Sequence, residues 1–411
     1  MGNNTWPFIT KLKRDIIWYL SANIFYKFVG YIVIVILARY LGKDTLGKYF
    51  FALSFVGLFV ILSEWGINPL LTRVISRDRS DTYNYMSHIM GLRIILCVIC
   101  FLIINILAFI LQKQILGIIL LTSIFMLIES LYSSMGALFL AYKKVKYNII
   151  SGVSTKILFV FLIIGVLYYK PDLINILWVH VIASLFMFLL GFFITRTKIT
   201  RIKPAFDFEI YRQILKHSFP FALLTIIGII FYRADSIMLG FMKDYTAVGI
   251  YGAGYKLREA ISFIPGSIAM ILYPRMAELY KKPTELKKIY SKAIKWIILP
   301  GLVTTVGVFP LARQIILTIY GPQFINSVQV LRILYLTLPF MFVNVITVSL
   351  FKAINRENVL VVIAIGCFLL KIFLNFYFIP IYDYLGVAIN TIIIDVAQFG
   401  IFSYYIHKLI R

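Results

Sequence analysis

Charged residues are scarce in this chain, and acidic residues are the scarcest. Only 14% of its 411 residues are charged while 61% are hydrophobic, and 17 Asp and Glu stand against 41 Lys and Arg. A soluble globular domain has about 25% charged residues, so this composition excludes one. Cysteine is also rare: Cys97, Cys100 and Cys367 lack the second pair or the partnering histidine that a zinc site needs. We interpret them as packed thiols.

The chain also lacks the common motifs of soluble enzymes. It has no GxxxxGK[ST] loop and no HExxH sequence, and it shows no convincing nucleophile constellation. These absences argue against ATP hydrolysis within the chain and favour a transporter over an enzyme. We expect no catalytic residues, no cofactor and no metal.

Long apolar stretches occupy most of the sequence. Each is long enough to cross a bilayer as a helix, and the connectors leave no room for an extramembrane domain. The first stretch lacks a small-residue cleavage site, so we expect it to stay as a span. The twelve predicted helices lie at about 16–41, 46–71, 86–111, 115–141, 148–169, 173–195, 214–241, 246–275, 289–318, 328–351, 358–380 and 385–407. The predicted fold class is an all-α polytopic membrane protein.

Basic residues gather at alternate ends of these helices. They precede the first predicted helix and follow each even-numbered one, whereas the opposite connectors hold only scattered lysines. The positive-inside rule therefore predicts an inner-membrane protein with both termini in the cytoplasm. The formal charge of +24 would suggest nucleic acid binding in another chain, but here the basic residues set topology. We expect no nucleic acid partner.

The sequence shows signs of an internal duplication. Its longest polar connector predicts an N-terminal six-helix lobe at 1–198, a cytoplasmic linker at 199–213 and a C-terminal six-helix lobe at 214–411. Gly47 and Tyr49 are echoed by Gly249 and Tyr251, each pair following a Lys-Asp dipeptide. Both halves start and end on the cytoplasmic side, so an axis along the membrane normal should relate them. This arrangement predicts a central cleft between two lobes.

A set of charges lies inside the predicted helices. A charge near a helix centre costs about 2.5 to 3.5 kcal/mol on the insertion scale, so these side chains should face the bundle interior or water. The set comprises seven cations and three carboxylates, namely Lys27, Arg93, Lys156, Arg233, Lys256, Arg258, Lys371, Glu129, Asp235 and Asp395. The surplus of cations predicts an electropositive cavity, which would attract a phosphate-bearing substrate.

Individual charges have two interpretations. Lys27 and Lys371 lie near mid-membrane and are the strongest candidates for substrate contact, while Glu64, Glu129, Asp235 and Asp395 are candidates for coupling to H+ or Na+. Asp235 should find its partner on another helix, because the nearest cation on its own helix points elsewhere. In the structural alternative, Lys256 pairs with Glu259, Arg233 extends toward the headgroups, and Arg93 and Lys156 reach the cytoplasmic interface.

Several short segments of the sequence carry a family resemblance. The first-half segment is Ala-Arg-Tyr-Leu-Gly-Lys-Asp-Thr-Leu-Gly-Lys-Tyr at 38–49, followed by Glu-Trp-Gly-Ile-Asn at 64–68. The second half contributes Tyr-Arg-Ala-Asp-Ser-Ile-Met-Leu-Gly at 232–240 and Asn-Phe-Tyr-Phe-Ile-Pro at 375–380. These segments resemble Wzx-type polysaccharide flippases. The resemblance spans nearly the whole chain and implies the multidrug/oligosaccharidyl-lipid/polysaccharide exporter superfamily, with twelve helices in two lobes around a central cationic cleft.

The resemblance also implies a function. A polyprenyl-pyrophosphate oligosaccharide would move from the inner to the outer leaflet by alternating access, for O-antigen of lipopolysaccharide, capsule or another surface polysaccharide. By helix and depth, it assigns the pyrophosphate to Lys27, Arg233, Lys256 and Arg258, which with Arg93 and Lys371 form the predicted substrate-binding set. Membrane lipids would surround the chain, and glycosyltransferases and a polysaccharide polymerase would be functional partners.

Two other functions remain open. A cation-coupled drug antiporter of the same superfamily would depend on Glu129 or Asp235, although drug exporters use acidic cavities. A membrane polymerase or glycosyltransferase would need an acceptor site and a catalytic carboxylate, and Asp172 and Asp383 are lone acids in outer connectors.

Overall fold

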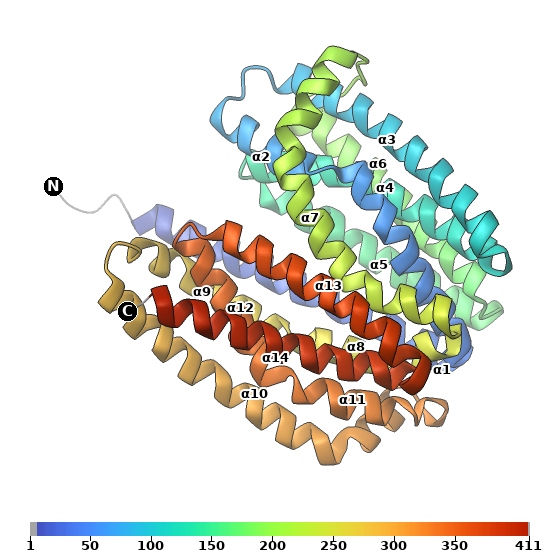
Figure 1. Cartoon of the computed structure of the whole chain (residues 1–411). Helices are drawn as coiled ribbons and strands as arrows, with labels where there is room; N and C mark the ends of the chain where they lie inside the picture. The colour runs from blue at the N-terminus through green and yellow to red at the C-terminus, as the bar shows by residue number, and fades with distance from the viewer. Residues whose placement is uncertain (1–5, 410–411) are drawn as a thin grey trace. The chain divides into compact units, whose positions relative to one another are not determined.

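A computed structural model describes the backbone of residues 6–409 and the side chains of residues 28–408, apart from that of residue 224. Within these ranges the regular structure is helical and contains no strand (Figure 1). The helices are α1 (Trp6–Glu64), α2 (Ile67–Arg77), α3 (Thr82–Leu111), η1 (Lys113–Ile115), α4 (Leu116–Ala141), α5 (Val145–Tyr169), α6 (Leu173–Lys198), α7 (Phe208–Met242), α8 (Tyr245–Ile261), α9 (Phe263–Glu278), α10 (Pro283–Ile319), η2 (Pro322–Phe324), α11 (Ser327–Leu336), α12 (Leu338–Ala353), α13 (Glu357–Tyr382) and α14 (Tyr384–Leu409).

The helices match the predicted membrane spans. Ten segments of the described chain are long and apolar enough to cross a membrane, and an eleventh is formed by α11 and α12 together, which meet at a bend of 48°. Helix α1 contains the first predicted span and most of the second, which continues into α2, and Gly42 separates the two spans with φ 81° and ψ 175°. Glycine adopts this conformation without the steric cost that a side chain would impose. Counting α1 as two spans gives the predicted twelve and confirms the all-α polytopic fold.

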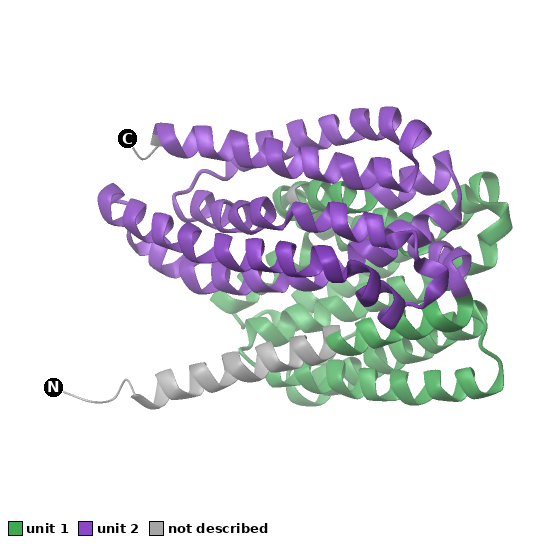
Figure 2. Cartoon of the chain, turned by 90° about the horizontal axis from the view of Figure 1, so that it is seen from below, with its two compact units in different colours: residues 1–41, 52–233 green, residues 42–51, 234–411 purple. Residues whose placement is uncertain are grey.

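The chain forms two compact units (Figure 2). Unit 1 comprises residues 1–41 and 52–233, and unit 2 comprises residues 42–51 and 234–411. The boundary between the two packed units therefore falls within α7. The lobe boundary at the linker 199–213 was inferred from the sequence and stays a prediction. The first part of α7 belongs to unit 1 because Tyr211 and Ile214 are buried in the core of that unit.

Each unit has its own apolar core. In unit 1, α4 packs between α2, α3 and α6, where Leu71, Met86 and Leu138 are fully or almost fully buried. In unit 2, α12 packs against α9, α10 and α14, while α11 packs against α8. Close packing between helices is the main source of stability inside a bilayer, since lipid removes most of the hydrophobic driving force for helix association.

Two glycines bring helices of unit 2 into backbone contact. A Cβ atom on Gly47 would overlap the carbonyl oxygen of Tyr245, and one on Gly249 would overlap the carbonyl oxygen of Lys43. The contact is reciprocal, because each glycine touches the residue four positions before the other. These glycines are the ones that the two halves of the sequence share. Small residues at helix crossings are typical of membrane proteins because they let backbones approach closely.

This crossing predicts a specific sensitivity to substitution. We expect Gly249→Ala to lower the free energy of unfolding by about 1 to 3 kcal/mol, the usual cost of overpacking a well-packed site. The measurement is thermal unfolding of the purified protein in detergent, followed by monodisperse recovery. Gly366→Ala in α13 is the matched control, because a Cβ there meets no atom within 4 Å. Equal melting temperatures for the two variants would contradict the assigned close contact.

Candidate functional site

A buried ion pair joins two helices of unit 2. Lys371 Nζ on α13 lies 2.8 Å from Asp235 Oδ2 on α7, and both side chains are almost fully buried. The partner of Asp235 thus comes from another helix, as the sequence predicted. The cause is the spacing on α13, where the buried residues Ile363, Cys367, Lys371, Asn375 and Ile379 recur every four positions. This stripe turns Lys371 inward, away from lipid.

Neutral polar groups complete the surroundings of this pair. Tyr251 donates to Asp235 Oδ2 over 3.1 Å, and Asn375 Nδ2 donates to Asp235 Oδ1 over 3.0 Å. Asn390 Nδ2 lies 2.6 Å from Asn375 Oδ1 and 2.8 Å from the carbonyl oxygen of Lys371. The network connects α7, α8, α13 and α14. A buried pair of this kind is stable only when such hydrogen bonds offset the loss of hydration.

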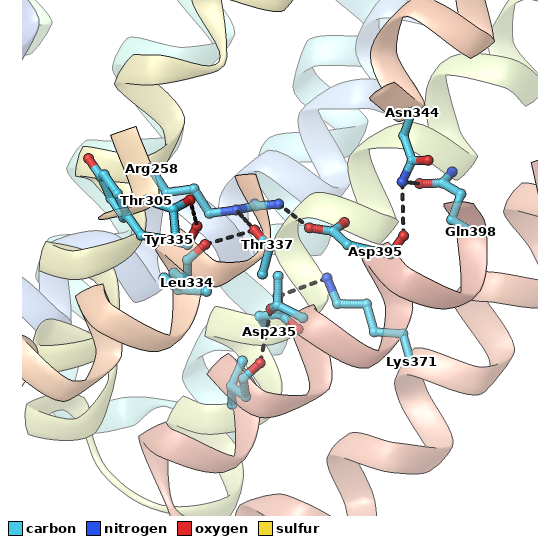
Figure 3. A network of polar contacts seen from close by, with 12 residues as sticks. Asp235, Arg258, Thr305, Leu334, Tyr335, Thr337, Asn344, Lys371, Asp395 and Gln398 are labelled. Atoms are coloured by element: carbon cyan, nitrogen blue, oxygen red, sulfur yellow. Dashed lines mark hydrogen bonds and ion pairs between the residues drawn. The ribbon is translucent and has the colours of Figure 1, made fainter. Parts of the chain in front are cut away.

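A second ion pair shares two of these helices (Figure 3). Arg258 Nη2 on α8 lies 2.5 Å from Asp395 Oδ2 on α14, and Arg258 Nε donates to Thr337 Oγ1 over 2.8 Å. Thr337 stands at the bend between α11 and α12, and Asn344 Nδ2 donates to the backbone oxygen of Asp395 over 3.0 Å. The positive charge of Lys371 also acts on Asp395, so the two pairs form one electrostatic cluster.

Unit 1 holds a cluster of another kind. Arg93 on α3 has no exposed surface, and its guanidinium donates to neutral acceptors on α2 and α4. Nη2 lies 2.8 Å from Asn68 Oδ1, Nη1 lies 2.5 Å from Ser133 Oγ, and Nη1 also donates to the carbonyl oxygen of Ser130. Glu64 lies close enough for its charge to act on Arg93. Arg93 therefore ties three helices together in the interior of the unit.

Glu129, the other candidate coupling carboxylate of unit 1, also has a cation nearby. Glu129 on α4 interacts electrostatically with Lys156 on α5 and with Glu64. Lys156 Nζ lies 5.3 Å from the ring centre of Phe159. The imidazole of His180 on α6 is 4.5 Å from the same ring, and its Nδ1 is 3.1 Å from the backbone oxygen of Ile176. The carboxylates Glu64 and Glu129 thus lie near the cations Arg93 and Lys156 inside unit 1.

The other predicted site residues are placed as follows. Lys27 lies outside the residues whose side chains the structure describes. Lys256 Nζ lies 2.6 Å from Glu259 Oε2, which is the pair named in the structural alternative. Arg233 is half-buried, and its Nε lies 3.3 Å from the position that a Cβ of Gly57 would occupy. The guanidinium therefore packs on the backbone of α1.

Sequence reasoning missed the amides of the network. Asn375, Asn390 and Asn344 are nearly or fully buried and bind the charged residues or their backbones. One signal was available, because Asn375 lies one helical turn after Lys371, and an amide beside a charge in an apolar helix indicates a shared buried face. Asn390 gave no such signal, since its contacts are made with α13.

Family models match much of the chain. The model described as polysaccharide biosynthesis protein matches residues 12–280, and the MatE model matches residues 220–377. Among curated proteins, an uncharacterized membrane protein of Methanocaldococcus jannaschii is 21% identical over 445 residues, covering 97% of this chain and 83% of that protein.

Solved structures share the fold. The lipid II flippase MurJ in an inward closed conformation has a TM-score of 0.75 and 17% identity, over 95% of this chain and 87% of that chain. An inward-facing multidrug resistance MATE family transporter of the MOP superfamily has a TM-score of 0.72 and 13% identity, over 96% and 98%. A MOP superfamily transporter from Pyrococcus furiosus, whose structure is described by a reversed polarity of its binding pocket, has a TM-score of 0.56 and 13% identity, over 98% and 96%.

The Asp235–Lys371 pair predicts a non-additive response to mutation. We expect Asp235→Asn or Lys371→Met alone to lower the free energy of unfolding by about 3 to 5 kcal/mol, because each leaves an uncompensated buried charge. The double variant should regain a large part of that loss, since both charges are gone. Denaturant or thermal unfolding in detergent measures the cycle.

The Lys256–Glu259 pair on α8 is the matched control. Its partners are 25% and 48% exposed, so removing either one should cost less than about 1 kcal/mol. An additive Asp235/Lys371 cycle would show that the two charges do not depend on each other.

Proposed function

Because the chain belongs to the polysaccharide biosynthesis protein family, we propose that it is a flippase for polyprenyl-pyrophosphate-linked oligosaccharide. The substrate would move from the inner to the outer leaflet of the cytoplasmic membrane by alternating access. One observation supports this choice above others: unit 2 holds two buried cations, Lys371 and Arg258, and each forms an ion pair with a carboxylate from another helix. Cations of this kind suit the phosphates of such a lipid.

The pairs suggest how binding and ion coupling would be linked. Lys371 cannot leave Asp235 inside the bilayer without another anion to receive it, and Asp235 cannot lose Lys371 without another cation. A pyrophosphate that takes the ammonium group of Lys371 would leave the carboxylate to a proton or Na+. Arg258 on α8 and Asp395 on α14 could exchange partners in the same way. Neither charge would then be bare at any step.

The other predicted residues keep their proposed roles. Lys27, Arg93, Arg233 and Lys256 complete the proposed substrate-binding set, and Glu64 and Glu129 would contribute to coupling from unit 1. Arg93 has no exposed surface in this conformation, so its contact with substrate would require α2, α3 and α4 to move apart.

The cellular setting follows from the same proposal. The protein would lie in the inner membrane with both termini in the cytoplasm, where its basic helix ends would stay. It would serve O-antigen, capsule or another surface polysaccharide, together with glycosyltransferases and a polymerase.

A cation-coupled drug antiporter is the second candidate. The match of residues 220–377 to the MatE model and the likeness to a MATE family transporter favour it. In that case Asp235 or Asp395 would bind the cationic drug or the coupling ion. The pairing of both acids with cations in unit 2 favours the flippase, because a cationic drug would have to displace a tethered cation.

Flipping in proteoliposomes tests the proposal. The native chain should move labelled undecaprenyl-pyrophosphate oligosaccharide under an imposed proton or sodium gradient, and the gradient that works identifies the coupling ion. The double variant Asp235→Asn/Lys371→Met should lose more than about tenfold in rate, because a hydrogen bond to a charged group is worth about 1.5 to 3 kcal/mol. Lys27→Ala and Arg233→Ala test the remaining cations in the same assay.

Arg275→Ala is the control for the loss of a cation. Arg275 forms an exposed pair with Glu278, so its removal should leave flipping unchanged. Native rates in the well-folded double variant would refute the exchange step. A native chain that exports cationic drugs and flips no lipid would move the assignment to the antiporter.

A further inference from the structure

A groove lies on unit 2, and none of its lining residues belongs to the two buried ion pairs. It has a volume of about 410 Å³ and runs between α10 and α14 over α12. Val343 and Phe399 form its apolar wall, and Ser291 and Ser403 contribute hydroxyl groups. Tyr290 is held in place by a hydrogen bond of 2.8 Å between its hydroxyl and Thr347 Oγ1. A space of this size suits part of a small molecule or a lipid.

Basic residues line one side of the groove. Lys287 and Lys295 come from one face of α10, and His407 comes from the end of α14. No carboxylate lines the groove, and among the residues that the structure describes neither lysine forms an ion pair. Lys287 and Lys295 are both exposed. The charge of the groove is therefore uncompensated and favours an anion.

The surface beside the groove is apolar. On α10, Trp296 is 70% exposed, Leu299 is 58% exposed and Val303 is 61% exposed. Leu299 and Val303 follow Lys295 at intervals of four residues, so this row turns gradually away from the groove, and Trp296 lies on the side of α10 opposite Lys287. Such an exposed apolar surface in a membrane-spanning helix faces lipid. Lipid therefore lies beside Lys295 at the edge of the groove, and an anion that enters from there carries an apolar chain.

The spacing of the cations matches a lipid headgroup. Lys287 and His407 stand near helix ends, and Lys295 lies about 12 Å deeper along α10 at 1.5 Å per residue. A lysine at that depth extends its ammonium group toward the interface. Its charge and that of Lys287 can then meet at one phosphate, while Val343 and Phe399 lie on the apolar side.

We propose that this groove binds an anionic phospholipid of the inner leaflet. The phosphate would contact Lys287, Lys295 and His407, and one acyl chain would lie along Val343 and Phe399. Basic pockets between membrane helices are a known way to recognise acidic lipids. This site has its own cations and does not depend on the flippase assignment.

Native mass spectrometry of the full chain in detergent tests the site. Titration with dioleoyl phosphatidylglycerol should give a saturable single-lipid adduct, and dioleoyl phosphatidylcholine should not. In Lys287→Ala/Lys295→Ala the apparent affinity should fall roughly 30-fold, at about 1 kcal/mol per basic residue. The matched control is Lys288→Ala/Lys292→Ala, which removes two exposed lysines of α10 that do not line the groove.

Competing ligands separate the sources of the anion. Inorganic phosphate at the same concentration should not displace phosphatidylglycerol, because it lacks the acyl chain. Displacement by phosphate would overturn the lipid site, as would equal losses in the two double variants. Preferential retention of undecaprenyl pyrophosphate would reassign the groove to the transported lipid. Loss of flipping with phosphatidylglycerol still bound would count against the proposed function alone.

Discussion

The bilayer interior does not tolerate an unpaired charge, and the packing of this chain follows from that constraint. In unit 2, Asp235 and Lys371 join α7 to α13, and Arg258 and Asp395 join α8 to α14. Each pair fixes the rotation of two helices, because a turn of either helix would carry a charge into lipid. The amides of Asn375 and Asn390 strengthen this effect, since they bind only in the same register.

Unit 1 satisfies the same constraint by other means. Arg93 is surrounded by hydroxyl, amide and carbonyl oxygens, with the charge of Glu64 close by. The groups that accept hydrogen bonds from this guanidinium are neutral, so none of them is an ion that could be exchanged. The pairs of unit 2 differ because both members can take new partners. An exchange mechanism is therefore better placed in unit 2 than around Arg93.

The sequence predicted much of this fold and less of the site. Helix positions follow from apolar length, and the inward orientation of Lys371 follows from a spacing of four residues, so both are local properties. The Lys256–Glu259 pair is local too, and the structural alternative described it correctly. The pairing of Asp235 with Lys371 is not local: many cations were available, and only tertiary packing selects one. The contacts of Asn390 could not be predicted for the same reason. The division of α7 between two units likewise depends on which core buries its side chains.

Pairing accounts for part of the positive charge that the sequence places inside the helices. The count gave seven cations and three carboxylates. Lys371 and Arg258 each pair with one of these carboxylates, and Lys156 lies near the third, Glu129. Lys256 pairs with Glu259, a carboxylate that was not in the count. Lys287 and Lys295 of the α10 groove, by contrast, form no ion pair among the described residues. This distribution separates two tasks. Charges inside the membrane can act only by exchanging partners, whereas charges at its edge are available to bind lipid phosphate without giving up a partner first.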